Sequence, residues 1–175
     1  MTTKNENTHP EKKPPEMSHV EMTQLILPSD TNALGTAFGG KIMQWIDIAA
    51  AVSATRHCGH ICVTASMDSL CFVRPMHVGD IITLFASINQ AWTSSMEIGV
   101  RVECEKTVSM TRQHTASAYL TFVCIDENGS PLRVPNVDAL TDNEKRRMRD
   151  ANFRRQHRLD LRERTAQKIP RPQKS

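Results

Sequence analysis

One apolar segment with a helical pattern, residues 39–57, precedes four consecutive segments with strand patterns, and this order restricts the fold most. Ile42, Ile46 and Ala49 repeat at helical spacing, and most other faces of the segment are apolar as well. A helix that is apolar nearly all round is typical of a buried central position. The order lacks the alternation of strands and helices that builds a doubly wound parallel sheet. We therefore predict an α+β fold with an antiparallel sheet around one central helix.

The expected strands are rich in β-branched residues, and one of them alternates clearly between apolar and polar side chains. Met96, Ile98 and Val100 alternate with Glu97 and Gly99, which predicts one buried face and one solvated face. We expect strands over residues 19–27, 61–73, 80–90, 94–105 and 112–126, with the first at a sheet edge because a proline ends it. A charged helix is expected from residue 142 to about residue 164.

Polar residues and prolines concentrate at the two ends of this 175-residue chain. We expect residues 1–18 to form a disordered arm and residues 165–175 a disordered tail, because such segments bury too little apolar surface to fold. The ordered part then consists of a domain over residues 19–140 and an arginine-rich helix over residues 141–164. This part is long enough to enclose a substantial core.

The five cysteines lie mostly in apolar segments, and their number is odd. Buried thiols behave as small hydrophobic groups, and this usage is typical of a reducing compartment. No apolar run approaches the length of a membrane span, and the first residues lack the apolar core of a signal peptide. We therefore expect a cytoplasmic protein without a membrane partner.

A turn-rich loop, residues 28–41, ends in two adjacent glycines and leads into the apolar helix. A glycine-lined helix start offers backbone N–H groups that have no partner within the helix. The helix also contains one acid, Asp47, which is costly in apolar surroundings unless it is paired or has a chemical task. Pairing with Lys41 or Arg56 at a subunit interface is one explanation. The other is a site that holds a carbonyl or phosphate and activates a reactant beside it.

Three well-known active-site patterns are incomplete or missing in this sequence. The run from Gly35 to Gly40 and Lys41 matches most of a phosphate-binding loop, but Ile42 stands where that loop needs a hydroxyl for Mg²⁺. Histidines and cysteines within residues 57–62 lack a second pair at ligand spacing, so we expect no bound metal. The G-x-S-x-G serine elbow of α/β-hydrolases is missing.

Six short motifs are spread along the part of the chain between about residues 20 and 160. They are Asp30-Thr31-Asn32, Phe38-Gly39-Gly40, Trp45-Ile46-Asp47, Thr55-Arg56-His57-Cys58, Val63-Thr64-Ala65-Ser66-Met67-Asp68 and Phe72-Val73-Arg74-Pro75-Met76, the last continuing to Val78-Gly79-Asp80. In order and spacing they resemble the acyl-CoA thioesterases of the cytosolic acyl-CoA hydrolase type, in which a sheet wraps around one helix as the hotdog fold. The resemblance implies hydrolysis of fatty acyl-CoA to a free fatty acid and coenzyme A, with neither a metal nor an organic cofactor.

The resemblance also implies that Asn32 and Asp47 are catalytic. Asp47 would act on water as a general base or form a covalent intermediate as a nucleophile, and the residues leave this choice open. The helix start at Gly39 and Gly40 offers an oxyanion hole, in which the Gly40 N–H polarises the thioester oxygen. The residues alone equally allow Asn32 to cap its turn and the glycines to permit close packing.

Coenzyme A requires cations for its phosphates and an apolar channel for its pantetheine arm. Arg56 and Arg74 are the candidate cations, and Thr64 belongs to a family motif that is expected to contact the substrate. Relatives usually have Gly-Arg-Thr-Ser-Met at a turn where this chain has Trp92-Thr93-Ser94-Ser95-Met96. Ser94 and Ser95 are therefore the expected contacts at this turn, and Trp92 either shapes the channel or packs.

Asp47 lies seven residues beyond Gly40, about 10 Å along the same helix, so its carboxylate is out of reach of a carbonyl held at the helix start. We predict a site shared by two chains, with Asn32 and Gly40 from one and Asp47 from the other. The resemblance implies a dimer, assembled further as a trimer of dimers. The alternative is a non-catalytic acyl-CoA-binding module that senses lipid status, but such a module would lack the polar pair.

The net charge of +3 comes largely from arginines in the C-terminal helix, and aromatic residues make up only 5% of the chain. So few aromatics argue against a surface that stacks on bases. We interpret the helix as a solvated face held by i,i+4 pairs, such as Asp150 with Arg154 and Asp160 with Arg164. Capture of CoA phosphates from a neighbouring subunit and contact with RNA are the alternatives, and a nucleic-acid partner is not expected.

Overall fold

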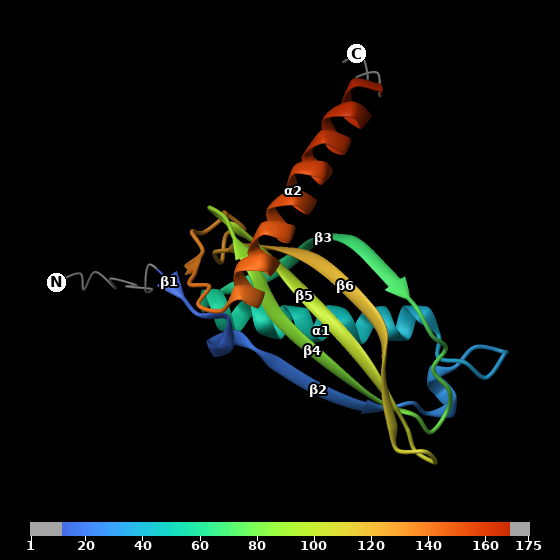
Figure 1. Cartoon of the computed structure of the whole chain (residues 1–175). Coiled ribbons are helices and arrows are strands. Elements are labelled where there is room, and N and C mark those ends of the chain that lie inside the picture. The colour runs from blue at the N-terminus through green and yellow to red at the C-terminus, as the bar shows by residue number, and fades with distance from the viewer. Residues whose placement is uncertain (1–11, 169–175) are drawn as a thin grey trace.

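The computed structural model describes residues 12–168, and at its centre an antiparallel sheet curves around helix α1, Gly39–Cys58 (Figure 1). The five strands lie in the order β2-β4-β5-β6-β3, and every neighbouring pair is antiparallel. They are β2 Val20–Leu25, β3 Ile61–Phe72, β4 Ile81–Ala91, β5 Ser95–Lys106 and β6 Thr111–Ile125. The predicted sheet around one helix is confirmed, and β2 lies at an edge as expected.

Helix α1 packs one face against the concave side of the sheet. Its residues Ile42 and Ile46 are fully buried in the same core as Leu84 of β4. The helix ends at Gly59, whose φ of 73° lies in the left-handed region and whose N–H donates to the Thr55 carbonyl at 2.8 Å. A glycine ends the helix without strain because it has no Cβ to oppose this backbone conformation.

The opposite face of α1 and the edge strand β3 leave large apolar side chains exposed. They are Met43, Ile48 and Val52 on the helix and Ile61, Val63 and Phe72 on the strand. In a single chain the helix is therefore buried on one side only, because the sheet covers one face. Exposed apolar surface of this kind marks an interaction site.

Residues 12–18, expected to belong to a disordered arm, are ordered. Strand β1, Lys12–Lys13, pairs in parallel with β7, Asn136–Val137, and the 3-10 turn η1, Pro15–Ser18, follows with both of its end residues buried. Local composition cannot reveal this, because the pairing partner lies near the other end of the domain. The expected disorder of residues 1–11 and 169–175 lies outside the described residues.

Helix α2, Asp142–Lys168, crosses the outer face of the sheet, opposite α1, and then extends beyond it (Figure 1). It continues to Lys168 instead of ending near residue 164, so residues 165–168 are helical where a loose tail was expected. Among the described residues, neither α1 nor α2 combines the length and the apolar character that a membrane crossing requires.

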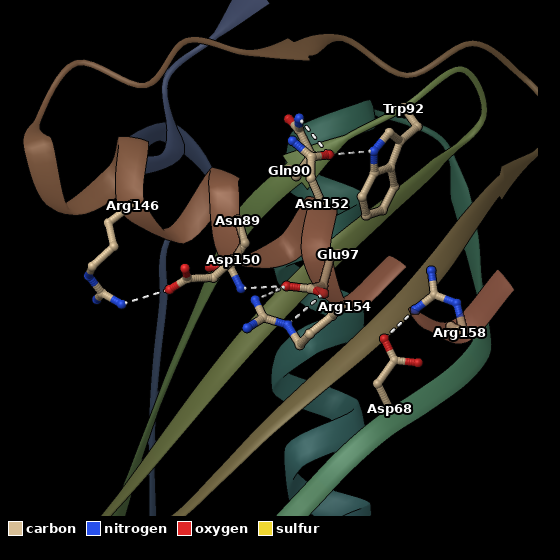
Figure 2. Close-up of polar contacts among 10 residues, drawn as sticks. All are labelled: Asp68, Asn89, Gln90, Trp92, Glu97, Arg146, Asp150, Asn152, Arg154 and Arg158. Carbon is tan, nitrogen blue, oxygen red and sulfur yellow. Dashed lines mark hydrogen bonds and ion pairs between the residues drawn. The ribbon is translucent and has the colours of Figure 1, made fainter. Parts of the chain in front are cut away.

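Helix α2 does form i,i+4 contacts, but the two pairs predicted by name, Asp150 with Arg154 and Asp160 with Arg164, are wrong. Asp150 pairs with Arg146 at 3.0 Å, and Asp160 accepts a hydrogen bond from Gln156 at 2.9 Å. Within the described residues Arg154 forms no ion pair or hydrogen bond with Asp150, because its guanidinium turns inward to Glu97 of the sheet, as Figure 2 shows. The sequence shows which residues of α2 are charged, but it does not show which partner each side chain faces.

Candidate active site

Asp47 and Thr64 are brought together because α1 packs beside strand β3. The Thr64 hydroxyl donates a hydrogen bond to Asp47 Oδ1 at 2.7 Å. Asp47 is half-buried, and within residues 12–168 its Oδ2 has no hydrogen-bond or ion-pair partner. Within a single described chain neither Lys41 nor Arg56 pairs with Asp47, since Lys41 lies 3.5 Å from Asp30 and Arg56 donates to the His19 carbonyl at 2.9 Å. The carboxylate thus has one oxygen fixed and the other available.

The start of α1 presents two backbone N–H groups that no group of the described chain accepts. The N–H groups of Lys41 and Ile42 bond to the Phe38 carbonyl at 2.9 and 3.2 Å, whereas those of Gly39 and Gly40 have no acceptor within residues 12–168. No side chain caps the helix. Because these groups lie at the positive end of the helix dipole, they are suited to hold an anionic oxygen.

Gly40 is the position at this helix start where a side chain would force the Phe38 ring to move. A Cβ at Gly40 would lie 2.5 Å from Cε1 of Phe38, whereas a Cβ at Gly39 would lie 3.7 Å from the Phe72 ring, an ordinary contact. The Phe38 ring, 58% exposed, therefore lies over the helix start. Phe38 was not among the predicted site residues, and its place directly before the glycine pair is the signal that identifies it.

Asn32 supports its own loop. Its Oδ1 accepts hydrogen bonds from the N–H groups of Leu34 (2.9 Å) and Thr36 (3.3 Å), and its Nδ2 donates to Thr36 Oγ1 at 2.9 Å. This is the turn-capping role that the sequence left open. No hydrogen bond joins Asn32 to Asp47 within the described chain, so a single chain does not assemble the expected catalytic pair.

An open groove of about 380 Å³ runs beside the helix start. Its walls are formed by Thr36, Ala37 and Gly39 on one side and by residues 72–76 on the other. Arg74 is the one charged residue of these walls, and its guanidinium donates a hydrogen bond to Gln113. The groove suits a largely apolar chain that ends in an anionic group.

The predicted coenzyme A contacts fall into two groups at opposite ends of α1. Gly39 and Arg74 lie at the helix start. Arg56 lies in the last turn, and the Ser94 carbonyl accepts the Cys124 N–H at 3.0 Å near the same end, beside Ser95. A helix of 20 residues is about 30 Å long, so one chain does not bring both groups to one point.

Trp92 packs against α2. Its indole Nε1 donates to Asn152 Oδ1 at 3.1 Å (Figure 2), and the Arg155 guanidinium lies 4.3 Å from the ring centre. A cation over an indole face is an attractive contact. The tryptophan at this turn therefore fastens α2 instead of lining the groove at the helix start.

The sequence of this chain is similar to those of known thioesterases. A model of the thioesterase superfamily matches residues 34–111. YkhA of Bacillus subtilis (strain 168), an uncharacterized acyl-CoA thioester hydrolase, is 43% identical over 127 residues, 73% of this chain and 74% of that protein.

Two solved structures extend the likeness to the fold. An apo hexameric acyl-CoA thioesterase has a TM-score of 0.83 and 39% identity, and the match covers 86% of this chain and 96% of that one. The acyl-CoA hydrolase of Staphylococcus aureus, in complex with butyryl coenzyme A, coenzyme A and coenzyme A disulfide, has a TM-score of 0.84 and 37% identity over 90% of this chain and 96% of that one.

Three variants of the Staphylococcus aureus enzyme have also been solved, each with alanine in place of one polar residue. The replaced residues are an aspartate, an asparagine and a threonine, and their sequence spacing equals that of Asp47, Asn32 and Thr64. The asparagine variant is in complex with coenzyme A. Since sequence identity and backbone agree over most of the chain, this protein belongs to the thioesterase superfamily, and its sheet around α1 is the hotdog fold.

Proposed function

We propose that this protein hydrolyses fatty acyl-CoA thioesters to a free fatty acid and coenzyme A. The observation that carries the proposal is the 2.7 Å hydrogen bond from Thr64 to Asp47, which holds a half-buried carboxylate in one orientation. The relatives support the same chemistry, because YkhA is named an acyl-CoA thioester hydrolase and the Staphylococcus aureus acyl-CoA hydrolase has been solved with butyryl coenzyme A.

In this proposal Asp47 activates the attacking water. Thr64 occupies Oδ1, so Oδ2 accepts a proton from the water while the water oxygen bonds to the thioester carbonyl carbon. The tetrahedral intermediate then expels the sulfur of coenzyme A, and the proton held by Asp47 passes to that thiolate. A positioned general base contributes about 10²–10⁴-fold to the rate.

The start of α1 stabilises the negative charge that develops on the carbonyl oxygen. The N–H groups of Gly39 and Gly40 have no acceptor in the described chain and point out of the helix start, so they are preorganised for an oxyanion. Asn32 positions the water. Its Nδ2 donates one hydrogen to Thr36, which leaves the second for a reactant.

The active site is completed by a second copy of the chain. Asp47 lies about 10 Å along α1 from Gly40, and the exposed apolar face of α1 and β3 offers the surface for pairing. Two structural neighbours are hexameric thioesterases. We propose a dimer in which each Asn32 and Gly40 face the Asp47 of the other chain, and a trimer of such dimers.

Coenzyme A is proposed to lie along the groove beside Arg74, with the Arg56, Ser94 and Ser95 end of a neighbouring chain at its nucleotide. It is substrate and product, and the scheme needs no metal and no organic cofactor for the chemistry.

A cytoplasmic location remains our proposal, supported by the five free thiols. The described arginines of α2 that face inward are engaged with the sheet and Trp92, which gives no support to a nucleic-acid role.

Release of coenzyme A from acyl-CoAs of increasing chain length tests the proposal, with wild type compared to Asp47→Asn and to Asp160→Asn as a matched surface control. We expect Asp47→Asn to lose about 10²-fold or more in kcat and Asp160→Asn to resemble wild type. Equal rates for Asp47→Asn and wild type would contradict the mechanism. Binding of acyl-CoA without release by wild type would instead support the non-catalytic module.

A further inference from the structure

Three thiols gather at the C-terminal end of α1, outside the candidate active site. They belong to Cys58, Cys62 and Cys124, and their Sγ atoms all lie within 4.8 Å of one another. The Sγ atoms of Cys58 and Cys62 are 3.1 Å apart. The cluster lies at the end of α1 where the proposed function places the coenzyme A nucleotide, beside Ser94, whose carbonyl accepts the Cys124 N–H at 3.0 Å. It takes no part in the hydrolytic step, which is proposed for Asp47 and the start of α1.

The fold builds the cluster from three separate elements. Cys58 is the last residue of α1, and the left-handed turn at Gly59 reverses the chain so that Cys62 on β3 returns to it. Cys62 stands directly opposite Cys124 of β6 in the antiparallel ladder, and such cross-strand pairs share a face of the sheet. Sequence spacing within residues 57–62 offers no second ligand pair and so predicts no bound metal. Cys124, far along the chain, supplies what the spacing could not show.

We propose that Cys58, Cys62 and Cys124 form a binding site for Zn²⁺. Thiolates are preferred ligands of this ion, which they hold at about 2.3 Å with tetrahedral geometry. In such a site the sulfur atoms are about 3.8 Å apart, a value that lies between the 3.1 Å that separates the Cys58 and Cys62 sulfur atoms and the 4.8 Å within which all three lie. Small side-chain adjustments bring all three sulfur atoms to one ion.

The surroundings complement a cation. Cys58 and Cys124 are fully buried, so the ion would be held in a water-poor environment, whereas Cys62 is half-buried. The site lies at the negative end of the α1 dipole, which favours a positive charge. The His60 N–H lies 3.4 Å from Cys58 Sγ, a contact of the kind that orients a thiolate ligand.

An open groove gives the ion access and a fourth ligand. It is lined by His60 and Cys62 together with Gly59, Asp126 and Glu127. Among the described residues no fourth His, Cys, Asp or Glu places a ligand atom within 4.8 Å of all three sulfur atoms, so a water from this groove would complete the tetrahedral coordination. The ion would link the end of α1 to strands β3 and β6, and its effect is on the stability of the fold.

The test uses the full-length protein kept reduced with a phosphine. Zn²⁺ affinity is measured by competition with a chromophoric chelator, and Co²⁺ is used as a spectroscopic substitute whose thiolate charge-transfer absorption reports sulfur ligands. We expect one equivalent per chain. Cys62→Ala and Cys124→Ala should each weaken binding by about 100-fold or more, and zinc should raise the Tm of wild type but not of these variants.

Cys71→Ala provides the matched control, because Cys71 is an exposed thiol on the same strand β3 and lies outside the cluster. It should bind Zn²⁺ and Co²⁺ as wild type does. Circular dichroism of each variant without metal separates loss of binding from loss of folding. The proposal is overturned if wild type shows no thiolate–cobalt absorption at stoichiometric metal, or if Cys71→Ala loses binding as much as Cys62→Ala. A Cys58–Cys62 disulfide in the reduced sample would overturn it as well.

Discussion

Arg154 of α2 forms a two-point ion pair with Glu97 of β5, whose side chain is completely buried (Figure 2). Its Nε lies 3.0 Å from Oε2 and its Nη2 lies 2.6 Å from Oε1, and Asn89 donates to Oε1 at 2.9 Å. The guanidinium also lies 3.7 Å from the ring centre of Tyr119. Helix α2 is thus fastened to the sheet by a buried charge that requires a partner.

Replacing Arg154 with methionine is expected to lower the free energy of unfolding by about 3–5 kcal/mol, because the Glu97 carboxylate would stay buried without a counterion. Denaturant unfolding measures this. The double variant Arg154→Met with Glu97→Gln should recover much of the loss, since an amide needs no counterion. As a control, Arg146→Met removes the exposed pair with Asp150 and should cost less than about 1 kcal/mol. Similar losses of unfolding free energy for Arg154→Met and Arg146→Met would contradict the expectation that the buried pair stabilises the fold more than the exposed one.

Thr64→Ala is expected to lower kcat by about 10-fold or more with little change in KM, because the Asp47 carboxylate loses the hydroxyl that orients it. Thr64→Ser keeps a hydroxyl and should retain most of the activity, whereas Thr64→Val keeps the shape and should behave like alanine. Steady-state kinetics of coenzyme A release provide the measurement. A valine variant as active as the serine variant would exclude this role.

Gly40→Ala and Gly39→Ala form a matched pair at the helix start. A Cβ at Gly40 would collide with the Phe38 ring at 2.5 Å, whereas a Cβ at Gly39 makes an ordinary 3.7 Å contact with Phe72. We expect Gly40→Ala to displace the ring across the N–H groups and to lower kcat by about 10²-fold, with Gly39→Ala much less affected. The reverse order of the two variants would contradict the assignment of Gly40 to the oxyanion hole.

The buried His57 imidazole is expected to make the stability of the fold depend on pH. It is buried in the last turn of α1, its ring Nε2 lies 2.9 Å from the Pro135 carbonyl oxygen, and its Nδ1 has no partner in the described chain. Burial lowers the pKa of His57 below the ordinary value of 6.5, although the hydrogen bond to Pro135 works in the opposite direction. The unfolded chain therefore takes up a proton near pH 6.5 while the folded chain does not.

The stability linked to His57 is accordingly complete above about pH 6.5 and is lost as the pH falls from there toward the lowered pKa. His57→Gln should flatten this part of a profile of Tm against pH, and His157→Gln on the exposed face of α2 should not. An unchanged slope in His57→Gln would mean that other groups dominate the acid response.

The strands and α1 were predictable because their patterns are local. Alternation such as Met96, Ile98 and Val100 records which face meets the core, and the structure places these strands within one or two residues of their predicted ends. The prediction that Glu97 lies on a solvated face is wrong, because α2 covers that face and the side chain is fully buried. The family motifs likewise gave Asp47 and Thr64 as candidate site residues. Their hydrogen bond is a consequence of packing that no spacing along the chain contains.

What the sequence missed depends on distant partners. Arg154 was expected to pair within its helix, but a buried glutamate on β5 competes for it more strongly than a solvated aspartate does. The β1 strand was hidden because its partner β7 lies far along the chain. The closeness of Cys124 to Cys62 could not be predicted for the same reason, since only the β3–β6 register brings the two residues together.

Subunit mixing tests the central claim, a hydrolytic site built from two chains, most directly. Asn32→Ala and Asp47→Ala, each inactive alone, are co-expressed with different tags and the mixed assemblies are purified. If Asn32 and Asp47 of one site come from different chains, random pairing leaves about one quarter of the sites intact. The account predicts about that fraction of wild-type coenzyme A release. Activity no greater than that of the separate variants would contradict it.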